Sequence, residues 1–300
     1  MSALAARMRK LRAEAGQVLA AAPNAGPQPR KPTFLSSASS PQLHSVTGTT
    51  TAPERAISPD LRRLLRRHAQ LKRGPTTLAS SDREVPGVEI APGLRYTVEF
   101  ADWLSPPAII DATFARMEPV HHGRLLHFDT ETTGLAGGTG TRAFMIGAAD
   151  WVDGRFRIRQ LTLTTMAAET AMLRTFAQWL SEDSVLVSYN GKCYDAPLLA
   201  TRYRLARLPN PLTGLGHLDL LHPVRRHWKH HWPNCRLATA ERQLLGVVRE
   251  DDLPGAEAPA AWLIYLRGGS ASNLRRVAAH NAQDLKSLAG VLVRMAAMPR

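Results

Sequence analysis

Two acidic residues follow an apolar run near the middle of the chain, and two more occur later in contexts that could bring them to the same place. Asp129 and Glu131 stand at the end of the run at residues 125–128. Residues two apart in a β-strand point to the same side, so both carboxylates would lie on one side of a sheet edge. Asp195 follows another apolar run and a turn, and Asp284 lies in a helical stretch. We therefore expect the four carboxylates to converge in one cleft.

Converging carboxylates provide the hard oxygen ligands that Mg²⁺ and Mn²⁺ prefer. In-line hydrolysis of a phosphodiester builds negative charge on the attacking water and the leaving oxygen, and two divalent cations about 3.5–4 Å apart stabilise both. His280 lies one helical turn before Asp284, and its imidazole could act as general base for the water. A surface acid, a helix cap or a turn explains each carboxylate better when it is taken alone. The four contexts together indicate a site for two metal ions.

The segments around these residues resemble the three motifs of the DEDD 3′→5′ exonuclease superfamily. The first motif is matched by residues 128–135, the second by Asn190-x-x-x-Tyr194-Asp195, and the third by residues 280–284. Within that superfamily the chain is most similar to the YprB-like ribonuclease H-like family. The resemblance runs from about Leu94 to the C-terminus, and three further segments support it: residues 137–141, 217–222 and 249–255.

The resemblance implies a 3′→5′ exonuclease that hydrolyses phosphodiester bonds of single-stranded DNA or RNA with two Mg²⁺ or Mn²⁺ ions. Asp129 would bridge both ions, Glu131 and Asp284 would hold the ion that activates water, and Asp195 would support the other. These four residues are the candidate metal ligands, and with His280 they are the candidate catalytic residues. The motifs also provide candidate substrate-binding residues, namely Thr130, Thr132, Gly134, Leu135, Asn190 and Tyr194.

Four residues in or near the motifs keep more than one interpretation. Superfamily histidines usually stand five residues before the last aspartate, whereas His280 stands four before it, so its role as base is open. Asn190 could orient the loop of the second motif or line a substrate groove, and Tyr194 is expected to pack rather than react. Asp219 could be a fifth acid of the cleft, a cap, or the partner of a nearby arginine.

Two segments also have competing interpretations. The glycines of residues 137–141 could let a nucleic-acid backbone approach closely or could form a flexible hairpin connection. A histidine-rich segment invites a zinc site, but its spacing fits no familiar zinc finger, and the interleaved tryptophans and lysine favour nucleic-acid contact over zinc. Plain packing is the simpler alternative for this second segment, which contains His217, His222, His227, His230, His231, Cys235, Trp228, Lys229 and Trp232.

The chain of 300 residues is strongly basic, with a formal net charge of +13 and a pI near 10.6. Such a charge indicates a polyanionic partner, although a GC-rich genome also enriches arginine. Two cysteines without close spacing favour a reduced compartment. No apolar stretch approaches the ~20 residues of a membrane span, and no secretory signal is apparent. We expect a cytoplasmic protein that does not enter a membrane.

Most of the excess charge lies in the first 90 residues, which carry fourteen Arg or Lys against six Asp or Glu. Residues 1–22 have helical periodicity and could bind a protein partner. Residues 23–53 are rich in Pro, Ser, Thr and Gly and are expected to be a disordered linker. A second helix begins at Ser58, and its basic face could contact phosphates or simply be solvated; the basic residues are Arg62, Arg63, Arg66, Arg67, Lys72 and Arg73.

The pattern after residue 120 predicts an α/β domain with a ribonuclease H-like mixed sheet of five strands flanked by helices, preceded by a basic, partly disordered N-terminal arm. The strands are expected at 125–130, 143–151, 155–164, 184–189 and 217–221, and the main helices at 168–181, 194–207 and 272–297. The expected units are residues 1–57 (basic helix and linker), 58–120 (basic helix and lead-in segment) and 121–300 (catalytic domain).

Two other functions fit the same residues. A ribonuclease H-like endonuclease uses similar carboxylates on the same kind of sheet, and a circular substrate distinguishes it from an exonuclease, which needs an end. A non-catalytic nucleic-acid-binding module is the alternative outside enzymes. The presence of all four acids argues against it.

Overall fold

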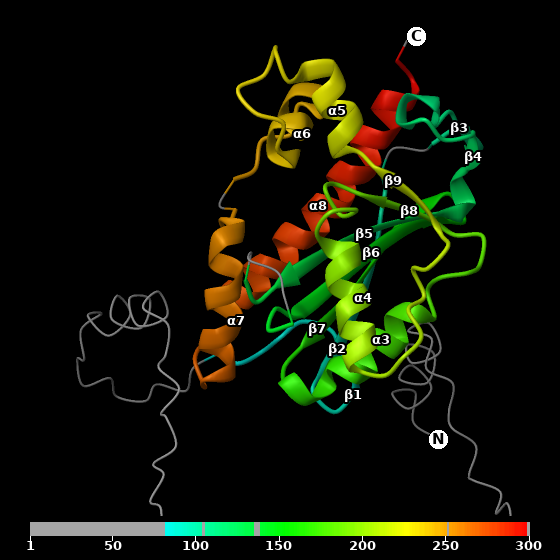
Figure 1. The fold of residues 1–300 in the computed structure, drawn as a ribbon. Coiled ribbons are helices and arrows are strands. Elements are labelled where there is room, and N and C mark those ends of the chain that lie inside the picture. Colours follow the sequence, from blue (N-terminus) through cyan, green and yellow to red (C-terminus); the bar gives the residue numbers. More distant parts are fainter. Residues whose placement is uncertain (1–81, 104–105, 135–138, 251, 299–300) are drawn as a thin grey trace, which may run out of the picture. The chain divides into compact units, whose positions relative to one another are not determined.

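The structure is a computed structural model that describes residues 82–103, 106–134, 139–250 and 252–298 (Figure 1). Several expectations lie outside these residues. They are the N-terminal helix and linker at 1–57, the basic helix that begins at Ser58, and Leu135, Gly137 and Gly138 of the loop after the first motif.

A seven-stranded mixed sheet forms the centre of the described part of the chain (Figure 1). The five strands β1, β2, β7, β6 and β5, in this spatial order, are antiparallel to their neighbours, whereas β5, β8 and β9 run parallel. A short separate ladder joins β3 (Ile109–Ile110) to β4 (Val120–His121). In spatial order the strands of the main sheet are β1 (Val88–Ala91), β2 (Leu94–Ala101), β7 (Arg155–Leu163), β6 (Ala143–Val152), β5 (Leu125–Thr132), β8 (Val185–Ser188) and β9 (Gly216–Asp219).

The mixed α/β sheet agrees with the expected fold class, but the expected number of five strands was wrong. Strands β5 to β9 are the five that the sequence predicted. Strands β1 and β2 extend the antiparallel edge, because β2 pairs with β7 along its whole length. The sequence signal was present, since Leu94 and Tyr96 are buried and alternate with polar neighbours, as in a half-buried strand. The sheet therefore includes residues that precede position 121.

The hairpin between β6 and β7 forms where the sequence predicts a turn. Asp153 and Gly154 both have positive φ, 51° and 76°. Two consecutive residues in the left-handed region form the kind of tight turn whose twist matches that of the flanking strands. This turn sets the register of β6 against β7 and so fixes the antiparallel half of the sheet.

Helices cover both faces of the sheet. Figure 1 shows α8 crossing one face, while α3 and α4 lie on the other. No helix in the described residues has the length and apolar content needed to cross a membrane. The helices are α3 (Glu169–Ala177), α4 (Asp195–Leu205), α5 (Leu221–Trp228), α6 (Leu237–Leu245), α7 (Ala258–Leu266) and α8 (Ser272–Ala296), with short 3₁₀ turns at η1 (Thr113–Ala115), η2 (His122–Arg124), η3 (Met166–Ala168) and η4 (Gly255–Glu257).

Two apolar cores follow from this layering. One core joins the sheet to α3, α4 and α7, and it contains Phe128 and Trp262. The other joins the sheet to α5, α6 and the later part of α8, and it contains Leu125 and Leu285. Because neighbouring strand residues face opposite cores, Asp129 and Glu131 point to the face that α8 covers. The sheet pleat therefore decides that these two carboxylates meet the residues of α8.

A glycine in β6 lets α8 approach the sheet at the place where the carboxylates lie. A Cβ atom added at Gly147 would stand 2.0 Å from Oδ1 of Asn281 and 2.9 Å from Cδ1 of Leu285. Both residues are buried in α8. Such an overlap displaces the side chains of Asn281 and Leu285 or separates the helix from the strand.

We expect Gly147→Ala to lower the free energy of unfolding by about 1–3 kcal/mol, since it overpacks the contact between β6 and α8. Urea unfolding followed by circular dichroism measures this. Gly140→Ala is the matched control, because no described atom lies within 4 Å of a Cβ added there. Equal stabilities of the two variants would show that α8 is not held against β6 in this way.

Candidate active site

The structure brings together the four carboxylates that the sequence singled out. Asp129 and Glu131 lie on β5, Asp195 is the first residue of α4, and Asp284 lies on α8. Burial raises the pKa of Asp129 well above its usual range, and the negative charges of Asp284, Asp195 and Glu131 raise it further. The expected convergence is therefore present in the described residues.

The other three carboxyl groups are perturbed in the same direction. Burial, reinforced by Asp284 and Asp195, raises the pKa of Glu131 to about 8 against the opposing effect of His280. Burial raises the pKa of Asp195 to about 6, although a hydrogen bond from Thr130 opposes the shift. Burial also raises the pKa of Asp284. The cluster concentrates more negative charge than its surroundings compensate, which is a common property of cation sites and catalytic sites.

Asp129 is held in place by a chain of amide hydrogen bonds. The side chain of Asn281 is fully buried and donates from Nδ2 to Oδ2 of Asp129 over 2.8 Å. Its Oδ1 accepts from Nε2 of Gln160 at 2.9 Å, and the same amide nitrogen of Gln160 donates to the carbonyl of Ala278 at 2.8 Å. Strand β7 and helix α8 therefore fix the orientation of Asp129 jointly. Neither Asn281 nor Gln160 was predicted to have a role, and a single glutamine in a strand carries no signal that could have identified it.

The loop after β5 is joined to the start of α4. Thr130 donates a short hydrogen bond to Oδ1 of Asp195. The hydroxyl of Tyr194 donates to the carbonyl of Gly134 at 2.5 Å and lies 3.1 Å from Oγ1 of Thr132, which also donates to that carbonyl at 3.0 Å. Tyr194 and the two threonines thus position the first and second motifs relative to each other. Whether these residues touch substrate remains a prediction.

Asp219 anchors the loop that leads to Asp195. Its Oδ1 accepts from the backbone N–H of Asn190 at 2.8 Å and of Leu221 at 3.0 Å, and its Oδ2 accepts from the N–H of Lys192 at 3.0 Å. Asn190 has a φ of 69°, which places the loop in the left-handed region there. Of the three interpretations of Asp219, the cap is the one that these contacts match. Its negative charge also helps to raise the pKa of Asp195.

His280 lies between two carboxylates. Its Nδ1 is 2.7 Å from Oδ1 of Asp252, and its Nε2 is 3.5 Å from Oδ2 of Asp284. Burial opposes the charged imidazole, but Asp284 and the hydrogen bond to Asp252 outweigh that effect and raise the pKa of His280. Asp252 entered the sequence analysis only as part of the segment 249–255, and its contact with His280 was not predicted, since 28 residues separate the two side chains.

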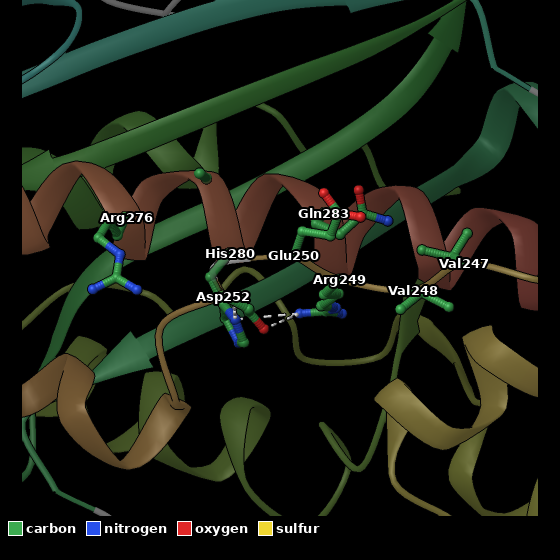
Figure 2. Close-up of a pocket in the computed structure, with 9 residues that line it drawn as sticks. Val247, Val248, Arg249, Glu250, Asp252, Arg276, His280 and Gln283 are labelled. Carbon is green, nitrogen blue, oxygen red and sulfur yellow. Dashed lines mark hydrogen bonds and ion pairs between the residues drawn. The ribbon is translucent and has the colours of Figure 1, made fainter.

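Arg249 contributes a positively charged side chain to the site. It forms a bidentate ion pair with Glu241, at 2.6 and 2.9 Å, and Glu241 is only 1% exposed. It also donates a short hydrogen bond to Asp284 and lies 3.3 Å from Asp252. Figure 2 shows Arg249, Asp252 and His280 side by side. Residues 249–255 were identified from the sequence only as a segment that supports the family resemblance, so the role of Arg249 was not predicted.

A pocket of about 410 Å³ opens beside these residues (Figure 2). This volume lies within the ~300–1,000 Å³ range of ligand sites. The pocket therefore adjoins the carboxylate cluster on the side of His280 and Asp284. It is lined by Val247, Val248, Arg249, Glu250, Asp252, Arg276, Ala279, His280 and Gln283.

The carboxylates are not already arranged as a closed set of metal ligands. Among the described residues, no three side chains of His, Cys, Asp or Glu form a group that could hold a metal ion as they stand. Three of the four acids are engaged by neighbours instead: Asp129 by Asn281, Asp195 by Thr130 and Asp284 by Arg249. The chemistry of the donor set, four carboxylates with raised pKa values, fits a hard divalent cation.

The histidine-rich segment is partly packed. Trp228 stacks on Trp232 with ring centroids 4.6 Å apart, and both pack against the core beneath α8. The ring of His217 lies 2.7 Å from the hydroxyl of Ser188. Packing therefore accounts for the two tryptophans, and the preferred nucleic-acid contact of this segment stays a prediction.

Comparisons with known proteins agree with the motifs. The sequence profile of the RNase H superfamily matches residues 126–296. A protein of Bacillus subtilis strain 168, named "Uncharacterized protein YprB", is 39% identical over 175 residues, which are 57% of this chain and 41% of that protein. The chain thus spans less than half of that relative. A family B DNA polymerase from Pyrobaculum calidifontis has 16% identity and a TM-score of 0.46 over 65% of this chain and 28% of its own. That structural similarity is too low to carry an argument about function.

We expect the metal-free protein to lose stability as the pH rises through the range in which Glu131 ionises. Its carboxyl has an ordinary pKa of 4.5 and a pKa of about 8 in the folded state. The proton is bound more tightly by the folded protein, so the stabilisation is complete below about pH 4.5 and is lost as the pH approaches 8. Urea unfolding in EDTA should show a fall of about 1–3 kcal/mol relative to Glu131→Gln between about pH 5 and 8.

The comparison with the variant is essential, because burial lowers the pKa of His127 and of His217 to about 4 and so gives the opposite dependence at lower pH. Glu118→Gln is the control, because it makes the same chemical change at an exposed position. If the unfolding free energies of wild type and Glu131→Gln run parallel across this range, Glu131 is not buried among uncompensated acids.

Proposed function

Because the chain belongs to the RNase H superfamily, as its motifs predicted, we propose that it is a metal-dependent 3′→5′ exonuclease acting on single-stranded DNA or RNA. The chain has the nuclease-type fold of this superfamily. The observation that carries the proposal is the convergence of Asp129, Glu131, Asp195 and Asp284, whose pKa values are all raised. Burying four acids together lowers the stability of the fold, and such clusters are typical of functional sites. The polarity follows from the resemblance of the three motifs to DEDD exonucleases.

The four carboxylates would hold two Mg²⁺ or Mn²⁺ ions. When bound, such ions lower the pKa of the attacking water and stabilise charge on the leaving oxygen. Asn281 and Thr130 keep Asp129 and Asp195 oriented for this role. Asp284 must exchange its contact with Arg249 for a cation, and Arg249 can remain paired with Glu241 when it does.

In this proposal His280 takes the proton of the water. Asp252 holds Nδ1 of the ring at 2.7 Å, which leaves Nε2 on the side of Asp284. The carboxylate of Asp252 and the guanidinium of Arg249, 3.2 Å from the same ring nitrogen, hold the orientation of the ring. The pocket beside His280 provides space for part of the substrate within reach of this base.

We expect Asp129→Asn to reduce cleavage by about 10³-fold or more while the protein remains folded, since it removes a carboxylate that would hold the metal ions. The assay uses 5′-labelled linear single-stranded DNA and RNA with Mg²⁺ or Mn²⁺. Asp153→Asn, in the β6–β7 turn, makes the same chemical change far from the carboxylates and should retain wild-type activity. Near wild-type turnover by Asp129→Asn would sink the assignment.

A circular single strand added to the same assay separates the two kinds of nuclease. An exonuclease leaves the circle intact, because it has no end at which to start. Cleavage of the circle at the rate of the linear strand would instead identify an endonuclease on the same fold.

We also expect Mn²⁺ or Mg²⁺ to raise the melting temperature, because a cation that binds only the folded state stabilises it by mass action. At about 100 times the dissociation constant the gain is about 2.7 kcal/mol. Thermal melts compare EDTA with saturating metal at matched ionic strength, and Asp284→Asn should show a smaller shift. Superimposable curves for the wild-type protein would mean that the acids do not form a cation site.

A further inference from the structure

A second hollow lies where β8 and β9 end. Its volume is about 340 Å³. Its basic walls come from three separate segments: Arg116 follows η1, Lys192 precedes α4, and Arg226 belongs to α5. Asp219, at the end of β9, also lines it. The fold therefore gathers three cationic side chains around one cavity.

The three cations of this cavity have no acidic partner among the described residues. Within the described residues, no hydrogen bond or ion pair engages the side chain of Arg116 or of Lys192. The guanidinium of Arg226 donates to the carbonyl of Phe114 at 3.0 Å and so keeps its charge. Elsewhere the arginines nearest the core are paired with acids: Arg159 with Asp150, Arg202 with Glu169, and Arg249 with Glu241.

The single carboxylate of the cavity does not cancel this charge. Asp219 is 4% exposed, and both of its oxygens accept backbone hydrogen bonds, one of them from the N–H of Lys192. These bonds also fix the backbone from which the Lys192 side chain projects. Arg116 has a φ of 60°, an unusual conformation that is frequent at binding sites. The cavity is thus a basic hollow whose one carboxylate is held by backbone hydrogen bonds.

The cavity adjoins the catalytic carboxylates through a shared loop. Lys192 stands three residues before Asp195, and the charge of Asp219 acts on Asp195. The pocket beside His280 adjoins the cluster through Asp284 instead. A strand whose scissile phosphate reaches the carboxylates can therefore extend toward Lys192.

We propose that this basic cavity binds a backbone phosphate of the nucleic-acid strand, away from the bond that is cleaved, through Arg116, Lys192 and Arg226. The inference rests on the proposed nuclease function and deepens it by assigning a subsite. Guanidinium and ammonium groups without acidic partners are the usual ligands of phosphate. A nucleic-acid strand whose scissile phosphate lies at the carboxylates has further phosphates along its backbone, and one of these can occupy the cavity.

The test measures binding without turnover. An oligothymidylate of roughly twelve nucleotides, within the usual range of single-strand sites, carries a fluorophore and is titrated in EDTA at several salt concentrations. The double variant Arg116→Gln/Lys192→Gln should bind it more weakly. Its log–log salt slope should fall by about 0.7 for each phosphate that the variant no longer neutralises. Arg174→Gln, an exposed change on α3, is the control for a general reduction in charge.

Arg116→Lys/Lys192→Arg retains both charges and should restore binding, and circular dichroism verifies that each variant is folded. If Arg116→Gln/Lys192→Gln binds with the affinity and slope of the Arg174→Gln control, the inference is overturned. Inorganic phosphate is tested separately, because a free phosphate ion could bind the same cationic side chains as a backbone phosphate. Inorganic phosphate could raise the melting temperature of the wild type but not of the double variant, while oligothymidylate binding is the same for both. That result would show that the cavity binds a small anion, and it would also overturn the inference.

The binding assay separates failure of this inference from failure of the proposed function. Loss of oligothymidylate binding in Arg116→Gln/Lys192→Gln supports the subsite even if the wild type shows no cleavage. Active cleavage by the wild type, together with unchanged binding by the double variant, refutes the subsite alone.

Discussion

The packing of α8 against β5 and β6 is the contact on which the site depends. It brings Asp284 to the face of the sheet that carries Asp129 and Glu131, and Gly147 leaves room for that approach. Burial then raises the pKa of every carboxyl group in the cluster, and repulsion by the neighbouring acids of the cluster adds to the shift of Asp129 and Glu131. The protein spends folding free energy to hold these acids together, which is the usual relation between stability and a preformed functional site.

Neighbouring groups limit that cost without removing it. Asn281 and Thr130 donate to two of the carboxylates, and Arg249 donates to a third while it stays anchored to buried Glu241. The amide and hydroxyl donors add no charge, so they orient the acids but leave most of the repulsion in place. The single arginine compensates the acids at the end near Asp284. A cation is therefore the group best suited to balance the remainder.

The parallel half of the sheet explains why the functional features gather at one edge. Strands β5, β8 and β9 run in the same direction, so their carboxyl ends lie together. The first carries Asp129 and Glu131, the second leads to Asp195, and the third ends at Asp219. Ligands in open α/β sheets bind at such carboxyl ends. The basic cavity continues the same edge, which places an anion-binding surface beside an acidic one.

The sequence by itself determined the local features of this protein. The two-residue spacing of Asp129 and Glu131 in a strand predicted that both face the same side of the sheet, and the apolar pattern marked five strands and the last helix. The alternation of Leu94 and Tyr96 with polar residues also marks β2, which the expected five strands did not include. The contacts of Asn281 with Gln160 and of Arg249 with Asp284 join residues 121 and 35 positions apart. Spacing along the chain encodes which face a residue occupies, whereas its partner across the fold depends on how helices and strands pack, so only the tertiary structure decided these pairings.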